Sequence, residues 1–420
     1  MLLILDSRLR GNDKWINMKI LEINKFYYLK GGSERYLFGL SKVLKRKGHD
    51  VLVFSMKEDS NLSSKYEKYF IDKVDLNKFS IKNIFKFFYN YDAIKKLKKI
   101  IQDQKPDVAH LHNIAHQFSP AIISVLKKNN IPVVQTLHDY KLICPNAILF
   151  SKNKVCDKCR GGKYYNCFAN KCMKDSWAKS FLGMAEAYLH NSFLKSYQNV
   201  DMFIAPSQFM KDKCVGFGIP EEKIKVIYNF LDFKDFDKSE IAELENYILF
   251  YGRLSSEKGI ETVLMAMKNL KSNINFKIVG SGPDYKKLAD KISALELSKR
   301  VEMLGPKYGD ELDVIIRKAK AVVISSLWPE NMPYCLLESM ASAKVAIVAK
   351  SGGMPELIKN EENGFLFEPG NYKKLANIID NLAYLDLREI GRRAKKSIEH
   401  LNANSHYRQI INLFEKIAKH

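Results

Sequence analysis

The sequence has no stretch of about 18 apolar residues without a charge, so a membrane-spanning helix is not expected. Only seven of its 420 residues are cysteine, too few for a secreted fold held together by disulfides. A secretory signal is also lacking, because Asp6, Arg8 and Arg10 interrupt the apolar opening at residues 1–5 before a longer apolar core can form. These absences predict a cytoplasmic protein whose thiols are reduced.

Acidic residues are scarce in the first half of the chain. Residues 1–200 hold 35 Lys and Arg against 17 Asp and Glu, a net charge of +18, whereas residues 201–420 hold 33 against 30, a net charge of +3. A basic half is typical of a protein with an acidic partner. The charge alone leaves three partners open: an anionic membrane surface, a nucleic acid or a phosphorylated substrate.

Short apolar runs alternate with helix-like segments along most of the chain. The runs are at 18–23, 51–55, 107–112, 132–138, 201–206 and 225–229, and then at 247–252, 276–280, 301–305, 322–325, 345–349 and 364–368. Continuous apolar strands separated by helices are typical of parallel sheets covered on both faces. The sequence therefore predicts an α/β fold of two doubly wound parallel-sheet, Rossmann-like domains that face a central cleft.

The same pattern predicts the domain limits. Residues 1–17 match no strand or helix pattern and are expected to form an extension outside the fold, with Met18 a plausible true start. The predicted segments are an N-terminal domain at 18–230 with a Cys-rich insertion at 144–172, a linker at 231–246, a C-terminal domain at 247–385 and a helical tail at 386–420.

Charged side chains and glycines follow the expected strands of the second half. Glu330 follows the run at 322–325, and Glu338 comes eight residues later, inside the next expected helix. In open parallel sheets ligands bind at this edge, and carboxylates there can accept hydrogen bonds from sugar hydroxyls. Arg253 and Lys258 follow the first strand of this half, where cations can hold phosphate oxygens. The simpler alternatives are a helix N-terminal acid at Glu330, a surface residue at Glu338 and a solvated basic loop.

The third motif, Gly280-Ser281-Gly282-Pro283, comes after the next strand. Small residues there would let a nucleotide approach the backbone, but a tight turn explains them equally well. Taken in order and spacing, Gly-Arg-Leu-x-x-Glu-Lys-Gly, Gly-Ser-Gly-Pro and Glu-x7-Glu resemble glycosyltransferase family 4. That is a family of retaining, nucleotide-sugar-dependent enzymes with the two-domain GT-B fold. The resemblance covers about residues 18–400.

The resemblance implies roles for the residues that match. Arg253 and Lys258 would hold the donor diphosphate, Glu338 the nucleotide ribose and Glu330 the hydroxyls of the donor sugar. The turn that meets the sugar is expected to consist of Asn331, Met332, Pro333 and Tyr334. Asn-Met-Pro replaces the usual Gly-Phe-Gly type of turn, which leaves the donor sugar open. Ala343 replaces a common glycine, and this single added methyl group is expected to matter less.

The first half fits the same resemblance. Gly31 and Gly32 follow the first strand, where family members place glycines beside the donor phosphates; a loop capped by Ser33 is the simpler reading. His138 ends a strand, and a family histidine in that place lies near the acceptor and the reacting carbon. A histidine can bond an acceptor hydroxyl or carry its proton near neutral pH. The resemblance therefore implies that His138 is catalytic together with Glu330, Arg253 and Lys258, and that His112 and Asp139 lie on the acceptor side.

Five of the seven cysteines cluster in one insertion. They are Cys144, Cys156, Cys159, Cys167 and Cys172. Thiolates at such spacings suit tetrahedral zinc, and a metal would order loops that are otherwise rich in polar residues. We therefore expect a structural zinc held by four of the five, with unrelated reduced thiols as the alternative. The resemblance to glycosyltransferase family 4 implies that catalysis itself needs no metal.

Residues 81–105 combine seven lysines with five aromatic residues. Apolar residues recur at helical spacing, at Ile84, Phe87, Phe88, Tyr91, Ile94, Leu97 and Ile101. This pattern predicts one amphipathic helix, which either lies in a membrane interface or packs its apolar stripe in the domain core.

Together these features predict a glycosyltransferase that moves a sugar from a nucleotide diphosphate sugar to a lipid-linked or glycan acceptor. The expected setting is the synthesis of bacterial cell-surface polysaccharide, peripheral on the inner face of the membrane and without a nucleic-acid partner. Two alternatives stay open at this point. One is a nucleotide-sugar epimerase of the same architecture, and the other is a zinc-stabilised nucleic-acid-binding protein, which would leave Arg253, Lys258, Glu330 and Glu338 unexplained.

Overall fold

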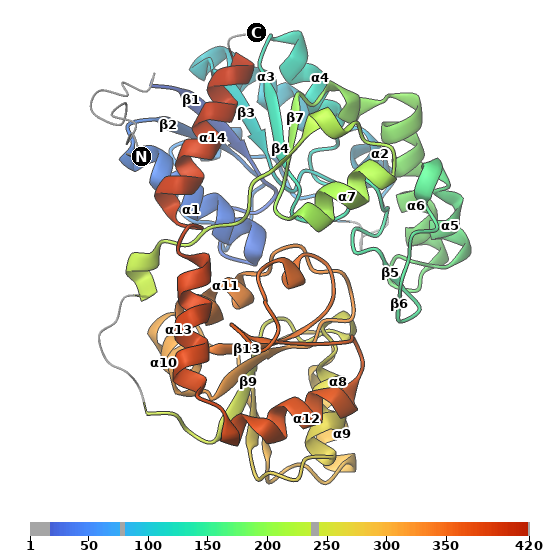
Figure 1. The fold of residues 1–420 in the computed structure, drawn as a ribbon. Helices are drawn as coiled ribbons and strands as arrows, with labels where there is room; N and C mark the ends of the chain where they lie inside the picture. Colours follow the sequence, from blue (N-terminus) through green and yellow to red (C-terminus); the bar gives the residue numbers. More distant parts are fainter. Residues whose placement is uncertain (1–16, 76–79, 237–242, 419–420) are drawn as a thin grey trace, which may run out of the picture.

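The computed structural model describes residues 17–75, 80–236 and 243–418, and the predicted extension at 1–17 lies almost wholly outside them. Two parallel six-stranded sheets build the two halves of the chain (Figure 1). The first sheet has the order β2-β1-β3-β4-β7-β8. Its strands are β1 (Lys19–Ile23), β2 (Asp50–Phe54), β3 (Val108–Leu111), β4 (Val133–Thr136), β7 (Met202–Ala205) and β8 (Ile224–Val226).

The second sheet has the order β11-β10-β9-β12-β13-β14. Its strands are β9 (Tyr247–Tyr251), β10 (Asn275–Val279), β11 (Val301–Gly305), β12 (Ala321–Ile324), β13 (Val345–Ala349) and β14 (Phe365–Phe367). Each sheet places its first strand inside the sheet and winds outward in both directions, and all pairings are parallel. The predicted α/β class and the two doubly wound sheets are confirmed.

Buried strands explain why the apolar runs are continuous. All residues of β3, β4, β9, β12 and β13 are buried, because helices cover both faces of each sheet. In the first half the helices around the sheet are α1 (Gly32–Arg46), α3 (Tyr91–Gln104), α4 (Ala121–Lys128) and α7 (Gln208–Gly216). In the second half they are α8 (Ile260–Lys268), α9 (Tyr285–Ala294), α10 (Gly309–Lys318), α11 (Tyr334–Ala341), α12 (Tyr372–Asn381) and α13 (Leu387–Ile398).

The end of the chain returns to the first half. Helix α13 packs against α11 and β13, and α14 (Ala403–Ala418) then packs against α1 (Figure 1). The Tyr36 hydroxyl on α1 hydrogen-bonds the His406 ring of α14 at 2.9 Å. The residues predicted as a tail are therefore two packed helices, of which the second completes the core of the other half. The domain limits themselves stay a prediction, and 237–242 of the expected linker lie outside the described residues.

The predicted single helix over 81–105 is wrong. The structure has two helices, α2 (Ile81–Phe88) and α3, separated at Tyr89 and Asn90, where Asn90 caps α3 by accepting the Ala93 N–H. The α3 part of the stripe, Ile94, Leu97 and Ile101, is buried in the core. Exposed apolar side chains are instead found on and next to α2, so only α2 retains the surface that a membrane-interface helix requires.

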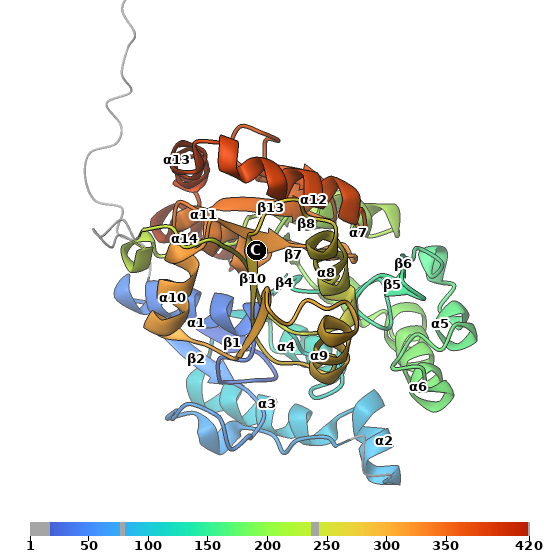
Figure 2. The ribbon, with the colours of Figure 1, turned by 90° about the horizontal axis from the view of Figure 1, so that it is seen from below.

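The Cys-rich insertion projects from the carboxyl end of the first sheet (Figures 1 and 2). It contains the two-residue strands β5 (Phe150–Ser151) and β6 (Lys154–Val155) and the helix α5 (Tyr165–Ala169), and α6 (Trp177–Ala187) follows it. Among the described residues, none of the helices combines the length and the apolar character that crossing a membrane requires.

Candidate active site

Lys258 and Glu330 form an ion pair at the carboxyl edge of the second sheet. Lys258 ends a short 3-10 helix after β9, and Glu330 lies in the loop after β12. Their charged atoms are 2.6 Å apart, and the Ser326 hydroxyl donates to the same carboxylate oxygen at 2.7 Å. Burial lowers the pKa of Lys258, but the charge and hydrogen bond of Glu330 outweigh it, and the net pKa is raised. Two of the four residues predicted as catalytic therefore lie together as an ion pair.

Arg253, the second predicted phosphate ligand, lies exposed in the same loop. The structure does not bring it into the ion pair of Lys258 and Glu330, since no ion pair of Arg253 occurs within the described part of the chain. An exposed guanidinium at this edge is available to a diphosphate. Its role stays a prediction.

Gly280 and Gly282 allow two loops to pack directly on each other. A Cβ atom would meet the Gly252 carbonyl oxygen at 1.9 Å if added to Gly280, and the Leu254 carbonyl oxygen at 2.1 Å if added to Gly282. Gly280 also has a φ of 140°, a backbone conformation that favours glycine. Glycine at both positions is thus already required by the packing of the loop after β10 against the loop that carries Arg253.

The turn at 331–334 joins the two halves of the molecule. The Asn331 side-chain amide donates to the His138 carbonyl oxygen at 3.1 Å, and the Met332 carbonyl accepts from the Asn229 side chain at 2.9 Å. Pro333 then precedes α11, which begins at Tyr334. Because His138 follows β4 and Asn331 follows β12, the carboxyl edges of the two sheets meet at this point.

Two glycines that the sequence reasoning missed support this turn. A Cβ atom on Gly352 would lie 1.8 Å from the Glu330 carbonyl oxygen, and the Gly353 N–H donates to that oxygen at 2.7 Å. In the sequence, the Gly-Gly pair that follows the apolar run at 345–349 was the pattern that could have indicated this turn. Ala343 carries a φ of 52° after α11, a left-handed conformation that costs a non-glycine residue about 1–2 kcal/mol. The expectation that replacing glycine there matters little is therefore wrong.

Glu338 on α11 pairs with Arg35 on α1, which is a second link between the halves. The Arg35 guanidinium also lies over the Tyr334 ring, 5.3 Å from its centroid. Burial raises the pKa of Glu338, and Arg35 offsets part of that rise. Gly31 and Gly32 begin α1 at the same place, and a Cβ on Gly32 would be 3.5 Å from Tyr334. Arg35 was missed because nothing in a helical sequence marks which residue reaches across to another domain.

A buried network leads from Glu22 on β1 to His138. The Glu22 carboxylate accepts from the His112 Nε2 at 2.6 Å, and the His112 Nδ1 is 2.9 Å from the His138 Nε2. Burial would raise the pKa of Glu22, but His110 and His112 lower it to about 2. Burial lowers the pKa of His112 to about 4, and burial together with His112 and His110 holds the pKa of His138 well below its usual value. Glu22 is therefore ionised and both rings are neutral at pH 7.

These charges fix the tautomers. The ionised Glu22 requires an N–H on the His112 Nε2, so the neutral His112 offers a lone pair at Nδ1. His138 must then donate its Nε2–H to it, which leaves the His138 Nδ1 as a proton acceptor. His112 is buried behind His138 but also borders the pocket next to that histidine, and its acceptor-side role stays a prediction. Glu22 had no signal in the sequence beyond an acid within an apolar strand.

Glu22, His110 and His112 are also the one set of three or more possible metal ligands within 4.8 Å of one another among the described residues. All three side chains are fully buried, and the His110 Nε2 is bonded to the Thr136 hydroxyl at 2.8 Å. Their ligand atoms are thus already used in hydrogen bonds. The set is better explained as the support of His138 than as a metal site.

A pocket opens beside His138 in the first half. Its lining includes Lys25, Asn113, Asp139, Lys141 and Tyr197. Asp139 accepts the Lys141 N–H at 2.8 Å, and the Lys141 ammonium pairs with the buried Glu186 at 2.6 Å. The predicted acceptor-side residue Asp139 therefore lines a pocket at the end of the His138 strand, just before the Cys-rich insertion begins.

Two protein-family models match the chain. Residues 30–235 match the model described as Glycosyltransferase Family 4, and residues 232–397 match the model described as Glycosyl transferases group 1. The two matches are contiguous and together cover most of the chain. The protein belongs to glycosyltransferase family 4.

Individual relatives agree with this. The chain is 29% identical to a glycosyltransferase of Methanocaldococcus jannaschii, MJ1607, over 92% of this chain and 95% of that protein. It is 26% identical to the putative colanic acid biosynthesis glycosyltransferase WcaL of Escherichia coli, over 54% of this chain and 60% of that protein. The solved structure of Anabaena Alr3699/HepE in complex with UDP and glucose superposes with a TM-score of 0.66 at 20% identity, covering 95% and 100% of the two chains. The fold is therefore the predicted GT-B fold.

Proposed function

We propose that this glycosyltransferase moves a sugar from a nucleotide diphosphate sugar to a lipid-linked or glycan acceptor, with retention of the anomeric configuration. The observation that carries the proposal is the ion pair of Lys258 and Glu330 at the edge where the two sheets meet. A cation for phosphate and a carboxylate for sugar hydroxyls, side by side, match the junction of a sugar and its diphosphate. Because the chain belongs to this family, glycosyl transfer is better supported than the activity of a nucleotide-sugar epimerase or the binding of nucleic acid.

In this proposal the second half binds the donor. Lys258 and Arg253 stabilise the charge that develops on the departing diphosphate, as preorganised cations do in other transfer reactions. Glu338 takes the ribose hydroxyls, for which it must exchange its ion pair with Arg35. The Anabaena neighbour, whose complex contains UDP and glucose, supports a uridine nucleotide as the first donor to test.

In the first half His138 receives the acceptor. Its Nδ1 lone pair can accept the hydrogen bond of the attacking hydroxyl and its proton during transfer. The pocket that Asp139 and Lys141 line would hold the rest of the acceptor. A part in polysaccharide synthesis rests on the names of relatives such as the colanic acid enzyme.

Donor binding is tested directly by a thermal-shift panel of nucleotide diphosphates and their sugars. A ligand at 100 times its dissociation constant stabilises the native state by about 2.7 kcal/mol, so one nucleotide family should raise the melting temperature while the free sugar does not. Lys258→Ala serves as the matched control, because it should lose most of the shift given by the diphosphate. Absence of any shift with every nucleotide sugar at millimolar concentration would contradict the proposed donor class.

The lipid-linked acceptor is supported by α2 and the basic first half. Ile81 and Phe85 on α2 are 66% and 70% exposed, and Tyr89 and Tyr91 are exposed beside them. Aromatic and apolar side chains next to lysines are typical of a helix that lies at an anionic headgroup surface. Lys95, Lys98 and Lys99 are exposed on the following helix, whereas Lys96 bonds the Phe70 carbonyl at 2.5 Å.

We therefore expect salt-sensitive binding to anionic vesicles and none to neutral vesicles in a sedimentation assay. Each Lys near such a surface contributes about 1 kcal/mol, so Lys95→Gln, Lys98→Gln and Lys99→Gln together should weaken binding strongly, and Phe85→Ser should weaken it further. The same change at the exposed lysines of the second half, Lys299, Lys373 and Lys374, is the control and should leave binding nearly intact. If the wild type stays in the supernatant with anionic vesicles, the acceptor is a soluble glycan.

A further inference from the structure

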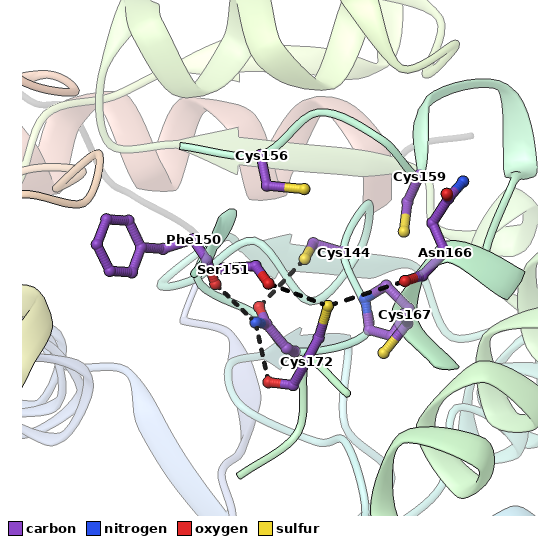
Figure 3. A pocket seen from close by; sticks show the side chains of 10 residues that line it. Cys144, Phe150, Ser151, Cys156, Cys159, Asn166, Cys167 and Cys172 are labelled. Atoms are coloured by element: carbon purple, nitrogen blue, oxygen red, sulfur yellow. Dashed lines mark hydrogen bonds between the residues drawn. The ribbon is translucent and has the colours of Figure 1, made fainter. Parts of the chain in front are cut away.

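Five thiols that are far apart in sequence line one pocket in the insertion. Figure 3 shows them together with Asn146, Ser151 and Asn166. Cys144 comes from the loop after β4, Cys156 and Cys159 follow the β5–β6 hairpin, Cys167 lies on α5 and Cys172 follows it. All five are free thiols. The fold, rather than the sequence spacing alone, thus collects them at one place.

The hydrophobic core of the insertion is small. Its own hydrophobic cluster has four buried members, Cys159, Tyr164, Cys167 and Ala187. Seven non-glycine residues between 147 and 175 have a positive φ: Ala147, Leu149, Lys152, Asn153, Lys171, Lys174 and Asp175. Such conformations cost about 1–2 kcal/mol each. A small core cannot offset a backbone of this kind, which is the situation in which a bound metal stabilises a loop-rich module.

The five sulfurs lie around one common space (Figure 3). The Cys167 and Cys172 thiols hydrogen-bond each other, and Cys167 also interacts electrostatically with Cys144 and Cys159. Cys167 is 1% exposed and packs in the small cluster with Tyr164 and Ala187. The Cys159 thiol interacts electrostatically with Cys144, Cys172 and Cys156, in that order. Thiolates that lie close together in a pocket are unfavourable unless a cation lies between them.

We propose that four of the five thiols of this pocket, Cys144, Cys156, Cys159, Cys167 and Cys172, bind one structural Zn²⁺. The four thiols lose four protons and the ion gains four zinc–sulfur bonds, with no change of oxidation state. Bonds of about 2.3 Å place ligated sulfurs about 3.8 Å apart, and no three thiols of the described residues lie within 4.8 Å of one another. Zinc binding therefore draws the β5–β6 hairpin and the 167–172 segment together, which loops with so small a core permit.

The zinc site would also fix a wall of the acceptor pocket. Cys144 is six residues from His138, and Lys141 between them lines the pocket beside that histidine. At the other end, Asp157 between the paired cysteines forms an ion pair with Lys213 of α7 at 2.7 Å. Loss of zinc should therefore loosen the acceptor side and leave the donor half unaffected.

The test is metal analysis of the full chain, purified under reducing conditions without chelator. We expect about one zinc per chain, and a Co²⁺-substituted protein with the d–d absorption of a tetrahedral thiolate site. Of the five variants Cys144→Ser, Cys156→Ser, Cys159→Ser, Cys167→Ser and Cys172→Ser, four should each lose most of the zinc, and the one that retains it identifies the thiol outside the site. Cys214→Ser is the matched control from elsewhere in the chain and should retain the zinc.

A variant that fails to fold would not decide the question, so the wild type is also titrated with a mercurial reagent. Zinc release should be complete once four thiols have reacted. Wild-type protein without zinc, or with fewer than seven reactive thiols after denaturation, would overturn the proposal in favour of free or disulfide-forming cysteines. Full retention of zinc in two or more of the five variants would overturn a site of four thiolates. Nucleotide binding should survive in every variant, which separates this result from a failure of the proposed donor site.

Discussion

Replacing Lys258 by alanine is expected to lower turnover by about 100- to 1,000-fold, the usual loss when one preorganised electrostatic group is removed from a transfer reaction. Lys258 lies 2.6 Å from Glu330, and its side chain is 22% exposed. The ammonium is therefore partly shielded from water, and its charge is screened less than that of a surface lysine. The measurement is initial rate with the nucleotide sugar identified in the thermal-shift panel.

The stability of the Lys258→Ala protein has to be measured together with its turnover, because the substitution leaves the buried Glu330 carboxylate without its cationic partner. The Ser326 hydroxyl still donates to that carboxylate, so the fold should persist, which circular dichroism will check. Lys287→Ala is the matched control, since Lys287 also pairs with a glutamate, Glu261, but on the exposed surface of α9. Turnover near the wild-type value in a folded Lys258→Ala protein would remove this residue from the site.

Glu22→Gln is expected to lower kcat by about 100-fold while leaving the KM for the donor almost unchanged. The glutamine amide can donate to the His112 Nε2, which the carboxylate cannot. His112 would then carry its proton on Nδ1 and donate to the His138 Nε2, so that the His138 Nδ1 becomes protonated and loses its capacity to accept. A change confined to kcat identifies Glu22 as a positioning residue for His138.

The control is His49→Gln, a second buried histidine of the first half, whose Nε2 lies 2.8 Å from the Tyr407 hydroxyl. It should lower stability and leave kcat unchanged. If Glu22→Gln and His49→Gln lower kcat equally, the network has only a structural role.

The same network makes an expected contribution to acid stability. The pKa of His112 is about 4 in the folded protein against 6.5 without the fold, so the unfolded chain binds more protons between these values. Stability therefore falls as the pH decreases from about 6.5 to 4, by roughly 1.4 kcal/mol per pH unit for a group that is fully charged only when unfolded. In His112→Gln this part of the slope should disappear in chemical unfolding measured across that range.

The sequence by itself determined the two parallel sheets and most of the residues at the edge of the second one. Continuous apolar runs become buried strands whichever way the halves are arranged, and charged residues directly after such strands are brought to one edge by the parallel geometry. Lys258 and Glu330 are 72 residues apart and nevertheless meet for this reason. The local pattern gave a wrong prediction at 81–105. Apolar residues continue at helical spacing across Tyr89 and Asn90, where the structure separates two helices.

Only the tertiary structure decided what crosses between elements. Arg35 reaches Glu338 from the other half, α14 returns to complete the core around α1, and Glu22 orients His138 through a second histidine. No periodic pattern in the sequence indicates these contacts, because each contact depends on how elements far apart in the chain are placed relative to one another. For the cysteines, the sequence and the tertiary structure each determine a part. Their number and local spacing predicted zinc, but the meeting of five thiols in one pocket depends on loops that carry almost no pattern of their own.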